Sequence, residues 1–147
     1  MSIKSHGEFN LIRRIRERLR ADSLDVVIGP GDDTAAVRTR PDTLTLMSTD
    51  AFVEGLDFTE DHSTWTQIGW KSMAANVSDI AAMGGIPKYA LVALCLPDDL
   101  RIEAVDQLCE GMKDLAQRFG VLIIGGDLSG TPGPITISVT ITGEVPP

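Results

Sequence analysis

The sequence predicts an α+β domain in which about three helices cover a mixed sheet of at least four strands. Three segments repeat apolar residues at helical spacing, and several shorter segments are continuously apolar or alternate apolar with polar residues. Glycine or proline separates most of these segments. The chain has 147 residues, 43% of them apolar, which is enough to form one hydrophobic core.

The predicted helices occupy residues 8–21, residues 64–83, and a segment from a cap at Asp98 or Asp99 to about Phe119. The first has arginines between the members of its apolar stripe, which indicates an amphipathic surface helix. The second is rich in Ala, Ser and Gly, so it is expected to pack closely against its neighbours. Glycines follow the second and third segments and are expected to end these helices.

Six short segments are predicted as strands: residues 25–29, 34–38, 43–49, 90–96, 121–124 and 135–145. Residues 90–96 are almost continuously apolar, which predicts a strand covered on both faces. Residues 135–145 alternate instead, which predicts one buried face. Asp50 is expected directly after the third strand and Asp127 just after the fifth, and residues 129–134 are expected to form a flexible loop.

Four short acidic motifs lie next to these apolar segments: Gly31-Asp32-Asp33, Ser48-Thr49-Asp50, Asn76-Val77-Ser78-Asp79 and Gly125-Gly126-Asp127. The first two, taken singly, are typical of a turn and of a capped strand end. Together the four favour carboxylates gathered at one place, where they would repel one another unless cations lay between them. Mg²⁺ prefers such hard oxygen ligands and usually contacts phosphate as well. The motifs therefore predict a multi-metal phosphate site.

The formal charge of −8 argues against nucleic acid as a partner, because a phosphate backbone requires a basic face. The basic cluster over residues 13–20 is interpreted as the solvated face of a helix. None of the four lysines follows a glycine-rich loop, and no protein-kinase signature is present. Phosphate binding is therefore expected to depend on metal ions and backbone amides.

Cys95 and Cys109 form neither a CxxC motif nor a zinc spacing, and both are interpreted as reduced core residues. The sequence has no signal peptide and no apolar stretch of the ~20 residues that a membrane helix needs. A cytoplasmic location without membrane contact is therefore expected. Pro146-Pro147 follows the last strand as a linker would, so the chain is expected to be one domain of a longer protein.

In their order along the chain, the motifs resemble the N-terminal domain of the thiamine-monophosphate kinase family, which has the aminoimidazole ribonucleotide synthetase-like fold. The resemblance covers the whole chain and rests on these segments: Gly7-Glu8-Phe9-Asn10-Leu11-Ile12, residues 29–35, Ser48-Thr49-Asp50, Val53-Glu54-Gly55, residues 69–84 and Gly125-Gly126-Asp127.

The resemblance implies an enzyme that uses ATP to phosphorylate thiamine monophosphate to thiamine diphosphate. It implies that residues 1–147 are the N-terminal ATP- and magnesium-binding domain, whose sheet pairs with a second subunit in a barrel across a homodimer. The family's C-terminal domain is absent from this chain, so the chain alone is expected to be inactive. The resemblance further implies that several Mg²⁺ ions are bound by Asp33, Ser48, Thr49, Asp50, Asp79 and Asp127. Gly126 and Asp127 would contact the nucleotide.

One position departs from the family pattern. The family usually has histidine, close to the substrate, where this chain has Asp57. Because a carboxylate repels phosphate unless a cation intervenes, Asp57 leaves open another ATP-using enzyme of this fold with a different phosphate or carbamoyl substrate. A separate alternative is a dimerisation module without catalysis, in which the aspartates only form caps and turns. The expected reaction is direct in-line transfer assisted by metal ions, with no catalytic side chain.

Overall fold

The computed structural model describes residues 2–20 and 23–147. The helices are α1 (Ile3–His6), α2 (Glu8–Leu19), α3 (Trp65–Ala82) and α4 (Ile102–Phe119). The strands are β1 (Val26–Ile28), β2 (Ala36–Val37), β3 (Leu44–Val53), β4 (Ile86–Leu96), β5 (Leu122–Gly130) and β6 (Thr136–Val145). The three long helices match the three that the sequence predicts, whereas the short α1 was not predicted. The predicted end of the first helix, Ala21, lies outside the described residues.

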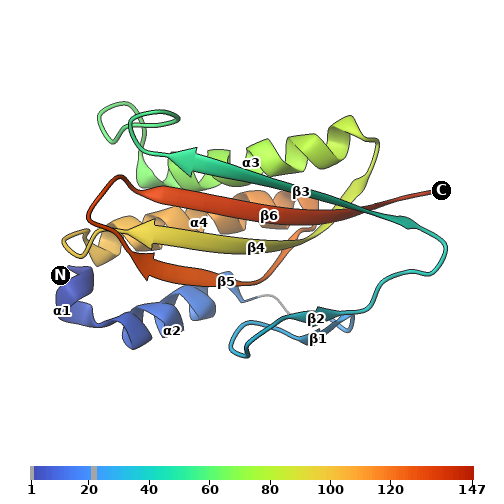
Figure 1. Ribbon diagram of the computed structural model, residues 1–147, viewed down its shortest axis with the longest axis horizontal. Helices are drawn as coiled ribbons and strands as arrows, with labels where there is room; N and C mark the ends of the chain where they lie inside the picture. The colour runs from blue at the N-terminus through green and yellow to red at the C-terminus, as the bar shows by residue number, and fades with distance from the viewer. Residues whose placement is uncertain (1, 21–22) are drawn as a thin grey trace.

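Four strands form a mixed sheet in the order β3-β6-β4-β5, in which only the β4–β5 pair is parallel. The prediction of a mixed sheet of at least four strands is confirmed. Strands β1 and β2 form a separate antiparallel hairpin beside the sheet (Figure 1). None of the described helices is both long and apolar enough to span a membrane.

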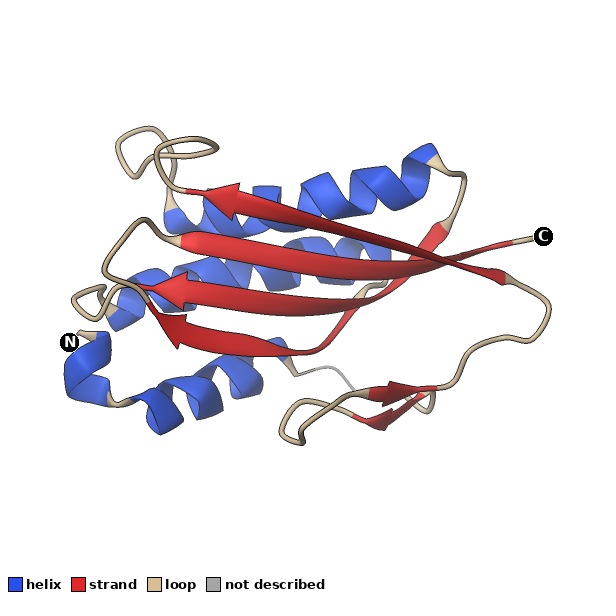
Figure 2. Ribbon diagram, in the orientation of Figure 1, coloured by secondary structure: helices blue, strands red, loops and turns tan. Residues whose placement is uncertain are grey.

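Helices α3 and α4 lie on one face of the sheet, and α2 lies beside the β5 edge, where it packs on α4 (Figure 2). Ile137, Val139 and Ile141 of β6 are fully buried against them, as the alternating pattern predicts. One copy covers β4 on one face only: Val92 is buried under the helices, but the neighbouring Leu91 is 42% exposed on the opposite face, so the predicted cover on both faces is not present within one copy. Within the described part of the chain, that second face carries no covering layer (Figure 2).

Two glycines bring α3 and α4 close together. A Cβ atom at Gly69 would lie 2.0 Å from the carbonyl oxygen of Leu108, and one at Gly111 would lie 1.9 Å from that of Thr66. The N-terminus of α3 is held by a capping box, in which the backbone N–H of Gln67 donates to Thr64 Oγ1 and the N–H of Thr64 donates to Gln67 Oε1. These contacts fix the helix that carries the third acidic motif.

Several predicted boundaries are wrong, among them the start of β4, which lies at Ile86 rather than at Ala90. Asp50 and Asp127 do not follow their strands but lie inside them, because long-range ladder partners extend β3 to Val53 and β5 to Gly130. The loop predicted over residues 129–134 accordingly begins later, after β5. Helix α4 begins at Ile102 without a side-chain cap from Asp98 or Asp99. The segment before it is instead held by α1, whose Ile3 and Lys4 donate backbone N–H groups to the carbonyls of Leu100 and Asp98.

Candidate metal site at the edge of the sheet

Ser48 and Asp79 meet where α3 crosses the edge strand β3. The hydroxyl of Ser48 donates to Asp79 Oδ2 over 2.6 Å. Ser48 is on the helix-facing side of β3, together with Leu46 and Phe52, which pack against the core. Asp79 is exposed on α3, so the carboxylate keeps access to solvent. The pair joins two of the predicted motifs, although 31 residues separate them in sequence.

Asp50 lies on the same side of β3 as Ser48, because residues two apart on a strand share a face. It is exposed, and it stands opposite Val139 in the β3–β6 ladder. Nothing in the described part of the chain forms a hydrogen bond or ion pair with its carboxylate. Thr49 points to the other face, where its hydroxyl donates to the carbonyl of Val139 over 3.2 Å and lies 3.0 Å from Thr140 Oγ1.

Asp127 lies at the far edge of the sheet, on β5. Strands β6 and β4 separate β5 from β3, so about three spacings of ~4.8 Å lie between the two edges. Asp127 stands beside Ala93 and accepts a 2.9 Å hydrogen bond from the hydroxyl of Ser129. The adjacent Gly126 packs tightly on β4, since a Cβ atom there would lie 1.8 Å from the carbonyl oxygen of Val92. Close strand packing therefore already requires glycine at this position.

Asp33 is exposed in the turn between β1 and β2, away from the four-stranded sheet (Figure 1). Its backbone N–H donates to Asp32 Oδ1 over 2.9 Å. Across residues 2–20 and 23–147, no three side chains of His, Cys, Asp or Glu gather so as to hold a metal ion. The single chain thus brings Ser48, Asp50 and Asp79 to one edge, and it leaves Asp33 and Asp127 elsewhere. The gathering of all four acidic motifs at one place is not seen within one copy, and the six ligand assignments stay predictions.

Asp57 has a local structural partner. Its Oδ2 accepts the backbone N–H of Val53 over 2.8 Å, which closes the turn after β3. The N–H of Gly55 donates to the carbonyl of Phe58 in the same turn. Glu54 ties this turn to the start of β6 by accepting the N–H of Ile135 over 3.1 Å. This carboxylate therefore stabilises its own loop, and its proximity to a substrate stays a prediction.

Lys71 is a cation near the candidate site that none of the four acidic motifs includes. The ammonium group of Lys71, on α3, lies 5.3 Å from the centroid of the Phe52 ring. Phe52 follows Asp50 by two residues on β3 and shares its face. Lys71 precedes Asp79 by two helical turns, and that spacing along α3 was the available signal. The edge therefore presents two carboxylates, a hydroxyl and an ammonium group.

These features define an α+β domain that presents hard oxygen donors at a sheet edge. The family described as AIR synthase related protein, N-terminal domain, matches residues 31–145, and the chain belongs to this family. The fold expected from the resemblance of the motifs is thereby confirmed, while the dimeric barrel is not part of what one copy shows.

Thiamine-monophosphate kinases are prominent among the similar proteins. The enzyme of that name from Rhodopirellula baltica is 41% identical over 125 residues, which cover 80% of this chain and 40% of the relative. The crystal structure of thiamine-monophosphate kinase from Stenotrophomonas maltophilia gives a TM-score of 0.78 at 36% identity, covering 99% of this chain and 44% of that one. The structure of AaThiL complexed with AMPPCP and TMP gives 0.70 at 32% identity, with the same coverage of 99% and 44%. The chain thus spans about two fifths of the length of the relatives that it matches.

Proposed function

We propose that this chain is the N-terminal, magnesium- and ATP-binding domain of a thiamine-monophosphate kinase. The observation that carries the proposal is the 2.6 Å contact between Ser48 and Asp79 beside Asp50. It joins two of the motifs on which the resemblance rests. The identity of 41% to a thiamine-monophosphate kinase supports the same activity for the protein that contains this domain.

The donor set at the β3–α3 edge suits Mg²⁺, which prefers carboxylate and hydroxyl oxygens and leaves further positions to phosphate and water. Asp50, Asp79 and Ser48 would hold the ion. When bound, Mg²⁺ would neutralise charge on the transferred phosphoryl group. Lys71 adds a positive charge on the same edge, near Phe52. These residues would bind and orient the polyphosphate, and none of them needs to act as an acid or base.

The proposed reaction joins the terminal phosphate oxygen of thiamine monophosphate to the γ-phosphorus of ATP. The bond between that phosphorus and the β–γ bridging oxygen breaks, and ADP leaves. Because the attacking phosphate oxygen is already an anion at neutral pH, the step requires no strong general base. Rate enhancement would come from positioning and charge neutralisation.

We further propose that two copies associate through the uncovered face of the sheet. Met47 and Leu91 lie on that face and are 76% and 42% exposed. Both edge strands of the sheet are unpaired within the described residues, and closing two four-stranded sheets into a barrel would remove these edges. Sedimentation equilibrium would report twice the mass of one chain, and a monomer at all concentrations would contradict this association.

The test of the metal site is a calorimetric titration with a non-hydrolysable ATP analogue in the presence of Mg²⁺. Replacing Asp79 with Asn should weaken binding at least about tenfold, since even outer-shell partners of a metal contribute 10–100-fold. The matched control is Asp114→Asn, because Asp114 is exposed on α4 and its replacement removes the same charge. An Asp79→Asn variant that binds as tightly as the Asp114→Asn control would refute the assignment.

The test of the activity is separate. The full-length protein that carries this domain should convert thiamine monophosphate and ATP to thiamine diphosphate and ADP, measured by chromatography. If other phosphate or carbamoyl compounds are used and thiamine monophosphate is not, the alternative substrate raised by Asp57 is correct. If Mg²⁺ leaves the melting temperature unchanged, the domain acts only in dimerisation, because a ligand of the folded state must raise it.

A further inference from the structure

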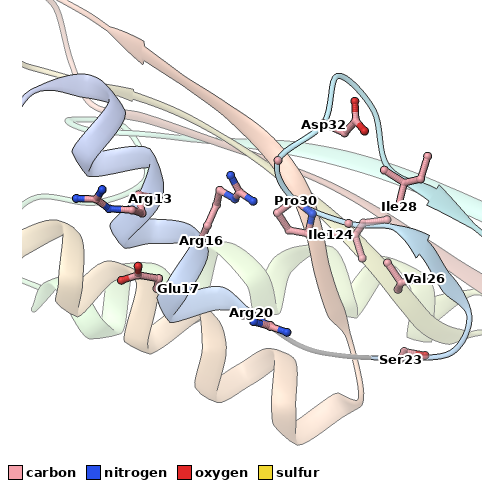
Figure 3. Close-up of a pocket in the computed structure, with 12 residues that line it drawn as sticks. Arg13, Arg16, Glu17, Arg20, Ser23, Val26, Ile28, Pro30, Asp32 and Ile124 are labelled. Carbon is pink, nitrogen blue, oxygen red and sulfur yellow. The ribbon is translucent and has the colours of Figure 1, made fainter.

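A basic cavity of about 640 Å³ lies between α2 and the β1–β2 hairpin (Figure 3). Arg13, Arg16 and Arg20 line it from α2. The turn over residues 29–32 lines it from the hairpin. The apolar part of its wall is formed by Val26, Ile28 and Ile124. We refer to this space as the α2–hairpin cavity, and none of the six predicted metal ligands lines it.

The arginines of α2 lie on two faces of the helix. Arg14 and Arg18 turn toward α4, where their Nε atoms lie 2.6 Å and 2.8 Å from Asp106 Oδ1. The three arginines of the cavity follow one another at intervals of three and four residues, which places them on one helical face. The interpretation of the basic cluster as a solvated helix face is wrong for Arg14 and Arg18, which bind a carboxylate. Arg13, Arg16 and Arg20 are exposed to solvent as expected, and they line the cavity.

Arg16 reaches the glycine turn directly. Figure 3 shows its side chain directed at the turn beside Pro30. A Cβ atom at Gly31 would lie 2.0 Å from Arg16 Nη2, and Gly31 has a φ of +123°, which favours glycine. In the part of the chain that the structure describes, the guanidinium of Arg16 forms no hydrogen bond or ion pair. Its N–H donors therefore remain available to an anion.

The charged residues that line the cavity are the three arginines together with Glu17 and Asp32, in a chain that carries −8 overall. Arg13 and Arg20 have partners of their own, Arg13 donating to Asn10 Oδ1 over 3.0 Å, so Arg16 is the guanidinium group that an anion would meet. Asp32 already accepts the N–H of Asp33 over 2.9 Å, and Figure 3 shows it directed away from the arginines. An arginine fork matches the oxygens of phosphate better than a point charge does.

We propose that the α2–hairpin cavity binds the phosphate group of a small organic phosphate ester. Arg16 makes the main contact, while Val26, Ile28 and Ile124 cover the organic part. This site requires no divalent ion. Its existence does not depend on the kinase activity or on the ligands at the β3–α3 edge, and it can fail without affecting either.

The test is a calorimetric titration of the chain with phenyl phosphate in the presence of EDTA. Arg16→Gln should weaken binding at least about tenfold, which corresponds to about 1.4 kcal/mol. Arg118→Gln is the matched control, because it removes the same charge from the exposed end of α4. Circular dichroism of each variant verifies that the fold is retained.

Two results would overturn the proposal. One is the absence of saturable binding to the wild-type chain. The other is an Arg16→Gln variant that binds as tightly as the Arg118→Gln control, since the phosphate contact would then lie elsewhere. A parallel titration with inorganic phosphate tests the apolar wall: phenyl phosphate should bind more tightly, and equal affinity would overturn the role given to Val26, Ile28 and Ile124.

Discussion

Replacing Gly69 with alanine should destabilise the domain through the contact between α3 and α4. The new Cβ atom would lie 2.0 Å from the carbonyl oxygen of Leu108, whereas ordinary contacts begin at 3.4 Å. The obstacle is backbone, so a side-chain rotation cannot relieve it, and the helices must separate by about 1.4 Å at this crossing. Gly111 presents the same situation from α4, where a Cβ atom would meet the carbonyl of Thr66 at 1.9 Å.

The size of the change in the free energy of unfolding follows from two opposing contributions. Overpacking of a core contact costs about 1–3 kcal/mol, and a clash with backbone belongs at the upper end of this range. Alanine in place of glycine recovers about 1 kcal/mol of helix propensity. The free energy of unfolding should therefore fall by about 2 kcal/mol in Gly69→Ala and by a similar amount in Gly111→Ala. One separation of the helices relieves both clashes, so the double variant should lose less than the sum.

Urea unfolding followed by far-UV circular dichroism measures these differences. Gly133→Ala is the control, because a Cβ atom there would lie 3.6 Å from Thr131 Oγ1, an ordinary contact. Its free energy of unfolding should stay within about 0.5 kcal/mol of the wild type. A Gly69→Ala variant as stable as this control would refute the reasoning. So would a double variant whose loss equals the sum, because independent effects cannot arise from one shared crossing.

Two further predictions concern α4. Hydrogen bonds from Arg14, together with the charge of Arg18, lower the pKa of Asp106. Asp106→Asn should therefore lower the free energy of unfolding by about 1 kcal/mol at pH 7. This difference should shrink as the pH falls through the native pKa of Asp106, which lies below the unfolded value of about 3.9, and a difference independent of pH in urea unfolding would contradict the prediction. Burial raises the pKa of the Cys109 thiol to about 12, so iodoacetamide at pH 8 should modify Cys109 only after denaturation, and mass spectrometry of native protein labelled at Cys109 would disprove this.

Local sequence pattern predicted the elements well because the apolar stripes are determined within each segment. The ends of β3 and β5 could not be predicted this way. Asp50 lies within a strand because Val139, almost ninety residues later in the chain, pairs with it. The exposure of Leu91 could not be predicted either, since a continuous apolar run does not show which face a covering layer will occupy.

The candidate site could be predicted only in part, because its motifs are local but their contacts depend on long-range packing. The motifs around Ser48 and Asp79 were visible in the sequence, and their contact depends on how α3 crosses β3, which only packing decides. Which arginines of α2 bind a carboxylate could not be predicted, because it depends on Asp106 of α4 lying opposite Arg14. Proximity of a residue on β5, such as Asp127, to the β3 edge cannot come from one sheet, because two strands lie between them.

The central claim is that the carboxylates at the β3–α3 edge bind divalent metal ions. Anomalous diffraction from a crystal soaked with Mn²⁺ and a non-hydrolysable ATP analogue tests it most directly. The account predicts an anomalous peak within coordination distance of the Asp79 carboxylate, with Asp50 or Ser48 in the same coordination sphere. Nucleotide-bound Mn²⁺ with no ligand from Asp79, and with the Ser48–Asp79 hydrogen bond intact, would contradict it.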